Sequence, residues 1–195
     1  MDRLPETSAG VPAVLCQRDP RWAAHPLGYP DASSDSTIGK YGCAITSLAM
    51  LLTYYGSPCT PDRVQAELAS QRGYRNTPTR NLVDWPQLTA IYPQIKSITR
   101  SDFLNRDPNA REMSALTAEL MSGKPAILKV DGVPGGDYDE HFVLATGVLE
   151  SGIIVADPYS GQLKPVTDFC PTNKPWRKTD AAAIWAILYF EMRLI

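Results

Sequence analysis

A wide apolar stripe with helical spacing stands in the first third of the chain and predicts a buried helix over residues 43–55. Gly56 follows the last apolar residue and supplies a helix stop. Because the stripe covers much of the helix circumference, this helix is expected at the centre of the core. Its apolar positions recur every three or four residues: Ala44, Ile45, Leu48, Ala49, Leu51, Leu52 and Tyr55.

Weaker helical patterns follow this segment. A threonine–proline pair provides an N-cap and a first-turn proline for a helix over 62–71. Residues 73–100 are rich in turn signals and predict only a short helix near 85–91. An aspartate–proline pair precedes a further helix, which runs through Met121 and is stopped by Gly123.

The second half of the chain changes from helical to strand-like patterns. Short apolar and β-branched runs bounded by turn residues predict strands at 126–130, 141–148 and 153–156. Residues 182–190 are apolar and ambiguous, and their aromatic and β-branched content favours a strand. Helices followed by a meandering antiparallel sheet indicate an α+β fold, in which an N-terminal helical part packs on a C-terminal sheet.

The N-terminal sequence shows no regular pattern. Residues 1–12 are interpreted as a flexible leader, and residues 13–36 are rich in Pro, Asp, Ser and Gly, which indicates irregular structure. A chain of 195 residues is long enough for one sizeable core, so residues 13–195 are expected to form a single domain.

The charge and hydropathy of the chain argue against several classes of protein. The formal net charge is −2, and no dense cluster of Lys and Arg marks a nucleic-acid or membrane surface. No apolar run is long enough to span a bilayer, and the N-terminal residues lack the hydrophobic core of a signal peptide. We therefore expect no nucleic-acid partner, no membrane span, and a cytoplasmic or particle-associated location.

The spacing of the cysteines argues against a metal site. No two cysteines form a CxxC pair, and the two histidines do not fall at zinc-finger spacing, so neither a metal nor another cofactor is expected. A chain of this size does not need disulfides, which favours free thiols. The cysteines are Cys16, Cys43, Cys59 and Cys170.

One cysteine stands where nucleophilic chemistry is favoured. Cys43 lies at the first turn of the predicted apolar helix, where backbone N–H groups and the helix dipole stabilise a thiolate. His141 begins a predicted strand and Asp157 ends the next one. Adjacent antiparallel strands would bring the two together, so that Asp157 orients the imidazole and the other ring nitrogen faces Cys43.

Four further residues are candidates for substrate contacts. Gln17 is the candidate oxyanion donor, together with the backbone N–H of Cys43. Gly42 leaves space for a substrate carbonyl beside the helix start. Tyr41 and Trp22 are candidates for lining the cleft, although a tryptophan in such a loop is more often a core anchor.

Simpler interpretations of the same residues remain open at this point. A cysteine in an apolar helix is often an inert buried thiol. Asp157 precedes a proline, and such a pair is common in turns. Asp139 is a competing acid, although its position two residues before His141 favours a solvent-facing side chain.

The order of short motifs along the chain resembles that of the bacteriocin-processing (double-glycine leader) peptidases and their papain-like relatives. The motifs span residues 14–161, so the resemblance covers most of the chain. They are Gln17-Arg18-Asp19-Pro20-Arg21-Trp22, Thr37-Ile38-Gly39, Gly42-Cys43-Ala44, Gly123-Lys124-Pro125-Ala126, His141-Phe142-Val143 and Asp157-Pro158-Tyr159-Ser160-Gly161.

The resemblance implies a papain-like α+β fold and assigns roles to four residues. Cys43 would be the nucleophile, His141 the general base and acid, and Asp157 the residue that orients the imidazole. Gln17 would lie in the oxyanion hole. Its spacing from Cys43 is longer than in the transporter-linked members, as the stand-alone relatives allow, and we therefore expect no attached transporter.

These observations predict a thiol hydrolase that cleaves a peptide or amide bond through an acyl-enzyme. A leader peptide, a peptidoglycan peptide and a protein all present a suitable carbonyl, so the substrate is left open. Two alternatives belong to other classes. One is a catalytically silent papain-like module that binds a peptide or assembles with a partner, for example in a phage particle or a secretion apparatus. The other is a thiol acyltransferase.

Overall fold

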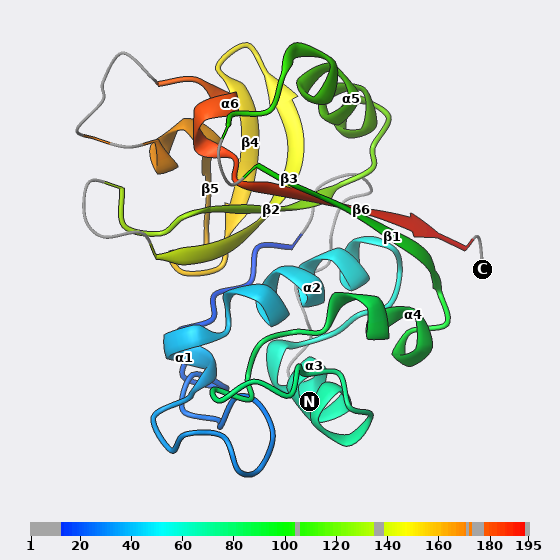
Figure 1. The fold of residues 1–195 in the computed structure, drawn as a ribbon, viewed down its shortest axis with the longest axis vertical. Coiled ribbons are helices and arrows are strands. Elements are labelled where there is room, and N and C mark those ends of the chain that lie inside the picture. The colour runs from blue at the N-terminus through cyan, green and yellow to red at the C-terminus, as the bar shows by residue number, and fades with distance from the viewer. Residues whose placement is uncertain (1–12, 104–105, 135–138, 171, 173–177, 194–195) are drawn as a thin grey trace.

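One antiparallel sheet of six strands runs through the described part of the molecule, and helices cover both of its faces (Figure 1). The architecture is α+β, as the sequence predicts. The structure is a computed structural model and describes the following residues: 13–103, 106–134, 139–170, 172 and 178–193. The leader expected at residues 1–12 lies outside the described residues.

The spatial order of the strands differs from their order in the sequence. The order is β1-β6-β2-β3-β4-β5, so that β1 and β5 form the two edges of the sheet. Strand β6, the last in sequence, is inserted between β1 and β2 and pairs with both. The strands are β1 (Ile95–Asp102), β2 (Ala126–Asp131), β3 (Glu140–Leu149), β4 (Gly152–Asp157), β5 (Gln162–Pro165) and β6 (Ala186–Met192).

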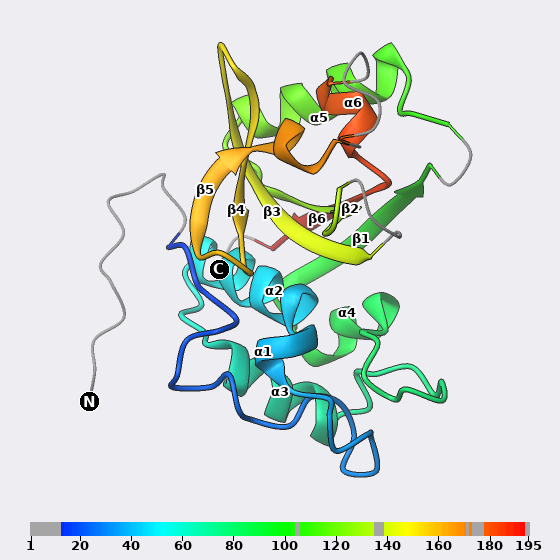
Figure 2. The ribbon, with the colours of Figure 1, turned by 90° about the vertical axis from the view of Figure 1, so that its left-hand side faces the viewer.

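The helices divide between the two faces of the sheet. Figure 2 shows α1, α2, α3 and α4 on one side and α5 and α6 on the other. The helices are α1 (Ile38–Tyr41), α2 (Cys43–Tyr54), α3 (Pro61–Ser70), α4 (Leu88–Ile91), α5 (Ala110–Met121) and α6 (Asp180–Ala183), with 3-10 turns η1 (Trp85–Gln87) and η2 (Val166–Phe169).

Each face of the sheet carries its own cluster of buried side chains. On one face Phe142 and Leu144 of β3 pack with the apolar residues of α2, and on the other Val143 and Ala145 pack with Leu116 of α5. Successive residues of a strand face opposite sides, so burial on both sides requires a continuous apolar run. This is why the central strands β2 and β3 have strong sequence signals.

The main helices lie close to their predicted ranges: α2 ends at Tyr54, one residue before the predicted end, and α3 covers 61–70 where 62–71 is predicted. Gly56 follows α2 with a φ of +81°, and Gly123 follows α5 with a φ of +77°, a conformation that glycine adopts readily. Thr60 is the N-cap of α3. Asn109 and Glu112 form a capping box at the start of α5, which satisfies two of its free N–H groups.

The predicted strand over 182–190 is wrong in its first part. Helix α6 occupies residues 180–183, because Thr179 caps it by accepting a hydrogen bond from the N–H of Ala182. Strand β6 begins only at Ala186 and continues to Met192.

Two edge strands and one short helix are not predicted from the sequence. The pairing of β1 shifts between Ile95 and Ser97, and this irregularity breaks the alternation of apolar and polar residues. Strand β5 has only four residues and ends in a proline, which is typical of an edge. Helix α1 is a single turn without a strong pattern of its own.

Candidate active site

Cys43 is the first residue of α2 and lines a cleft of about 670 Å³ between the α2 side of the molecule and the start of β3. The first N–H groups of a helix have no partner within the helix and favour negative charge beside them. Helix α1 ends immediately before this point, where the N–H of Gly42 donates to the carbonyl of Ile38 at 2.8 Å. Two helices meeting at Gly42 therefore place the thiol at the cleft.

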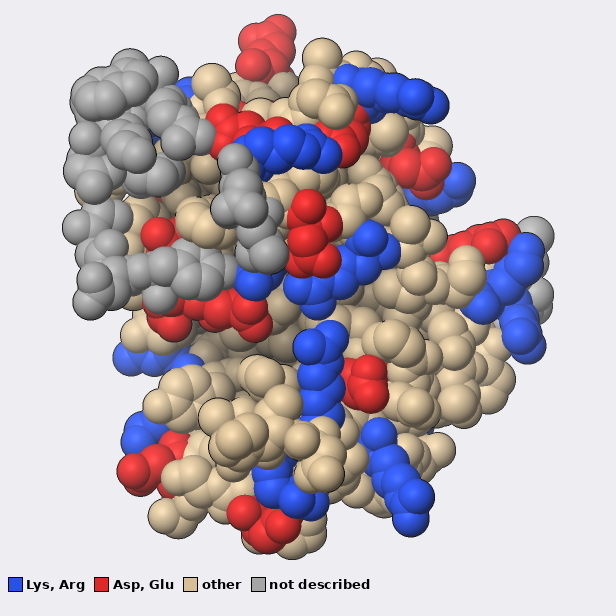
Figure 3. Space-filling model, in the orientation of Figure 1, with Lys and Arg blue, Asp and Glu red and all other residues tan. Residues whose placement is uncertain are grey.

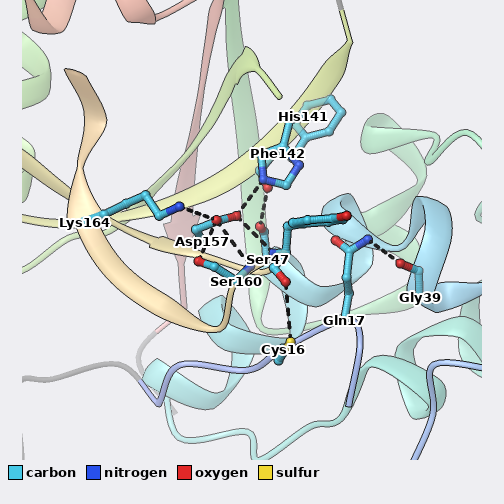
Figure 4. Close-up of polar contacts among 10 residues, drawn as sticks. Cys16, Gln17, Gly39, Ser47, His141, Phe142, Asp157, Ser160 and Lys164 are labelled. Carbon is cyan, nitrogen blue, oxygen red and sulfur yellow. Dashed lines mark hydrogen bonds and ion pairs between the residues drawn. The ribbon is translucent and has the colours of Figure 1, made fainter. Parts of the chain in front are cut away.

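The helix that carries the thiol is tied to the strand that carries the imidazole. Ser47 lies one turn after Cys43, and its buried hydroxyl donates to the carbonyl of Phe142 at 3.1 Å. Phe142 is the neighbour of His141 on β3, and His141 itself pairs with Val130 of β2. The hydrogen bond of Ser47 is drawn in Figure 4. This hydrogen bond fixes the position of α2 relative to β3.

His141 and Asp157 are in direct contact. Nε2 of His141 lies 2.7 Å from Oδ1 of Asp157, and both side chains are buried (Figure 4). Ala145 of β3 pairs with Val155 of β4, and His141 and Asp157 lie an even number of residues from this pair. Their side chains therefore share one face of the sheet. The contact leaves Nδ1 of His141 for Cys43.

The carboxylate of Asp157 accepts hydrogen bonds from the turn that follows it and from the next strand. The N–H of Tyr159 donates to Oδ1 at 3.0 Å, the hydroxyl of Ser160 to Oδ2 at 2.7 Å, and the ammonium of Lys164 to Oδ2 at 2.8 Å. Burial alone would raise the pKa of Asp157, but the bonds from His141, Lys164 and Ser160 outweigh burial and hold this pKa well below its ordinary value. Asp157 is thus ionised.

The imidazole of His141 is held in its charged form. Burial lowers the pKa of His141, but hydrogen bonds to Asp157 and to Cys43 outweigh burial and raise it to about 9. Cys43 and His141 also line the same cleft, with the helix start of α2 next to the first residues of β3. Cys43, His141 and Asp157 are therefore brought together as the sequence reasoning expects.

Gln17 also lines the cleft beside Cys43. Its backbone N–H donates to the carbonyl of Pro158 at 2.7 Å, which fixes it next to the turn after Asp157. Its side-chain Nε2 donates to the carbonyl of Gly39 at 3.1 Å (Figure 4). Within the described residues, the buried Oε1 has no hydrogen-bond partner.

The structure corrects two of the expected substrate contacts. Trp22 is only 2% exposed and does not line the cleft, because its indole N–H donates to the carbonyl of Cys16 at 2.8 Å within the core. It supports the loop next to Gln17 instead. Gly42 is buried, and a Cβ at this position would lie 2.4 Å from the carbonyl oxygen of Ile38. The missing side chain makes room for α1, not for a ligand.

Tyr41 lies where a substrate contact is expected. It is 57% exposed and lines the cleft. Leu82 and Tyr159 are also exposed apolar side chains on the wall of the cleft. The same wall carries Arg75 and Asp139. Figure 3 shows the hollow between the upper and lower halves of the molecule, with acidic and basic side chains along it. The cleft thus offers both apolar and charged contacts.

Cys16, Cys59 and Cys170 are not among the residues that line the cleft. All four thiols are free. Burial raises the pKa of Cys59 to about 11, so this thiol stays protonated at neutral pH. Among the described residues, no group of three or more His, Cys, Asp or Glu side chains could hold a metal ion. A search of the same residues finds no helix with the length and apolar character of a membrane span.

A cysteine at a helix start that faces a His–Asp pair on an antiparallel sheet has the arrangement of the cysteine peptidase class. Residues 21–188 match the Peptidase_C39 like family, and the chain belongs to this family. The matched span includes Cys43, His141 and Asp157, and it excludes Gln17.

Two relatives illustrate how far this similarity extends. The chain is 25% identical over 170 residues to the uncharacterized protein YvpB of Bacillus subtilis (strain 168), which covers 73% of this chain and 68% of the relative. Among solved structures it is similar to a crystal structure assigned to a C39-like peptidase of Bacillus anthracis. The TM-score is 0.49 and the identity 19%, over 80% of this chain and 91% of the other.

The sequence reasoning missed three residues that contact the site. Ser47 could have been recognised from the sequence, since it is a polar residue one turn after Cys43 within an apolar helix. Lys164 could not have been recognised from the sequence, because it lies on an edge strand that the pattern of apolar and polar residues does not predict. Phe169 packs against the ring of His141 with centroids 5.7 Å apart, and only the tertiary fold brings η2 to this position.

Proposed function

We propose that the chain is a cysteine peptidase or amide hydrolase in which Cys43 is the nucleophile. The observation that carries the proposal is the position of His141, which is hydrogen-bonded to Asp157 through Nε2 and lines the same cleft as Cys43. Membership of the Peptidase_C39 like family supports the same class of activity.

The proposed reaction has two steps. The thiolate of Cys43 attacks the carbonyl carbon, a C–S bond forms, and the C–N bond breaks as the imidazolium of His141 gives its proton to the leaving amine. The neutral imidazole then takes a proton from water, whose oxygen attacks the thioester and releases Cys43. Asp157 keeps the ring oriented in both steps and stabilises its charged form.

Gln17 and the start of α2 supply the proposed oxyanion hole. The bond from Nε2 to the carbonyl of Gly39 fixes the amide and uses one of its two N–H groups. The second N–H and the backbone N–H of Cys43 are the proposed donors to the developing oxyanion. Because Gln17 is anchored to Pro158, this donor is positioned before the substrate binds.

The cleft supports an extended peptide as the substrate. Tyr41, Leu82 and Tyr159 offer exposed apolar contacts around Cys43, and an open cleft of about 670 Å³ is large enough for several side chains. We therefore expect cleavage of peptides with apolar or aromatic residues near the scissile bond.

The test is the pH dependence of alkylation at each cysteine, with iodoacetamide and mass mapping of the peptides. We expect rapid modification of Cys43 at about pH 6, because the proposed mechanism pairs Cys43, as the nucleophilic thiolate, with the imidazolium of His141. Cys59 is the internal control, since its raised pKa keeps it unreactive at this pH.

Two variants and one control variant complete the test. His141→Ala should remove the reactivity of Cys43 at about pH 6, and Cys43→Ala should abolish hydrolysis of a peptide library while Cys59→Ala leaves it unchanged. An ordinary thiol profile at Cys43, or full hydrolysis by Cys43→Ala, would contradict the proposal. The first result would favour a binding module, and the second would assign the hydrolysis to a group other than Cys43.

A further inference from the structure

The carboxylate of Asp157 is shared between two cationic groups. His141 Nε2 lies 2.7 Å from Oδ1, and Lys164 Nζ lies 2.8 Å from Oδ2. The side chain of Asp157 is 3% exposed and that of Lys164 only 25%. Figure 4 shows the lysine and the imidazole approaching the carboxylate from different sides. The ion pair between Lys164 and Asp157 is largely buried and adjoins the imidazole of His141. It therefore changes the electrostatic potential at the imidazole.

The position of Lys164 follows from the sheet register. Lys164 of β5 pairs with Val155 of β4, and Asp157 lies two residues further along β4. Directly opposite residues share a face of the sheet, so Lys164 and Asp157 are diagonal neighbours on that face. The ammonium also lies 5.3 Å from the ring centroid of Phe169, which packs against His141. These contacts restrict the lysine to the position beside Asp157.

We propose that Lys164 is a positioning residue of the site, which neutralises the charge of Asp157 and thereby keeps the imidazolium of His141 a sufficiently strong acid. The proposal rests on the proposed function, in which His141 must give its proton to the leaving amine. A carboxylate without a counter-charge would stabilise the imidazolium too strongly for this step. With Lys164 in place, Asp157 still orients the ring and stabilises the imidazolium, but less strongly than an unpaired carboxylate would.

The direction of the effect is fixed by the signs of the charges. Removing the positive charge of Lys164 leaves Asp157 fully negative toward His141, so the ring holds its proton to higher pH. Other ionisable groups around the ring are retained in the test variants: Cys43 on α2, Asp139 and Glu140 at the start of β3, Lys129 paired with Glu140, and Arg18 stacked on Tyr159.

The test is an NMR titration of the histidine ring protons, which does not depend on activity. The chain has only two histidines, and His25→Gln assigns the signals. Lys164→Gln keeps a hydrogen-bond donor without the charge, and we expect it to raise the titration midpoint of His141 by about one pH unit. Lys164→Arg should restore the original midpoint. The matched control is Lys96→Gln, which removes an ion pair of 2.6 Å, to Glu191, at the opposite edge of the sheet.

Each outcome of the titration either supports or overturns the proposed role of Lys164. An upward shift in Lys164→Gln that Lys164→Arg reverses supports the proposal, and the alkaline limb of kcat/KM should move by the same amount. An unchanged midpoint, or a shift that also occurs in Lys96→Gln, overturns it. Loss of folding in Lys164→Gln together with an altered midpoint in Lys164→Arg would overturn it as well, because the role would then be structural.

The alkylation experiment separates this proposal from the proposed function. If Cys43 of the unsubstituted protein has an ordinary thiol profile, the peptidase proposal fails whatever Lys164 does. If Cys43 reacts rapidly at about pH 6 and Lys164→Gln leaves the His141 titration unchanged, only the role of Lys164 is overturned.

Discussion

The hydroxyl of Ser47 donates to the carbonyl of Phe142, which connects the helix of Cys43 with the strand of His141. Both residues are buried, and each is close in sequence to one member of the proposed nucleophile–base pair. A side-chain bond to a backbone carbonyl fixes the position of the strand and not only of one rotamer. The distance between thiol and imidazole therefore depends on this contact.

Replacing Ser47 with alanine should weaken both folding and reactivity. The variant leaves the buried carbonyl of Phe142 without this donor, which costs about 1–3 kcal/mol in the free energy of unfolding. Urea denaturation measures this loss, and alkylation of Cys43 at about pH 6 should be slower. Ser70→Ala is the control, because Ser70 is exposed and bonds only to a carbonyl of its own helix. Equal effects of the two substitutions would contradict the prediction.

The raised pKa of His141 predicts a pH dependence of stability. The fold favours the charged ring, so this contribution is complete below the ordinary pKa of 6.5 and is lost as the pH rises through about 9. We expect the free energy of unfolding to fall by about 1–3 kcal/mol across this window. Urea denaturation across the window measures the fall, and His141→Gln should flatten it. A slope that persists in this variant would assign it to another group.

Gln17→Ala tests the proposed oxyanion hole. Loss of one such donor typically lowers kcat by about 10²–10³, while KM changes little because the donor acts on the transition state. Steady-state kinetics on a cleaved peptide measure the two constants separately. Gln87→Ala, at an exposed position outside the cleft lining, is the matched control. An increase in KM alone would instead indicate a role in substrate binding.

Gly42→Ala should disturb the junction between α1 and α2. The new Cβ would lie 2.4 Å from the carbonyl oxygen of Ile38, so one of the helices must move. We expect a loss of about 1–3 kcal/mol in unfolding free energy and slower alkylation of Cys43. At Gly147 a Cβ would meet no atom within 4 Å, so Gly147→Ala should be neutral or slightly stabilising. Retained stability and reactivity in Gly42→Ala would refute the steric argument.

The elements that the sequence predicts are those buried on both faces or marked by caps. Strands β2 and β3 have continuous apolar runs because helices cover both faces, and α5 is marked by the aspartate–proline pair before it and by Gly123 after it. Strand β1 is not predicted because its irregular pairing breaks the alternation of apolar and polar residues. Strand β5 is not predicted because four residues at the edge of a sheet are too few to show such an alternation. Edge strands take their conformation from the neighbour to which they bond.

The residues of the candidate site also divide into those that the sequence predicts and those that only the tertiary structure reveals. Cys43, His141 and Asp157 lie at the ends of regular elements. A prediction of these elements therefore also predicts that the three residues lie close together. Lys164 contacts Asp157 only because β4 and β5 pair in one register. Trp22 and Gly42 could not be interpreted correctly from the sequence, because a buried indole and a close helix contact are properties of packing.

The insertion of β6 between β1 and β2 has a consequence for biosynthesis. Residues 186–192 are the last of the described strands to leave the ribosome, yet they join β1 to the rest of the sheet and supply Leu188 and Phe190 to the core beneath α2. Strands β2 to β5 can pair as a local meander during translation, but β1 must wait for β6. The nascent chain therefore carries the thiol of Cys43 until residues 186–192 have been synthesised and the scaffold around it can be completed.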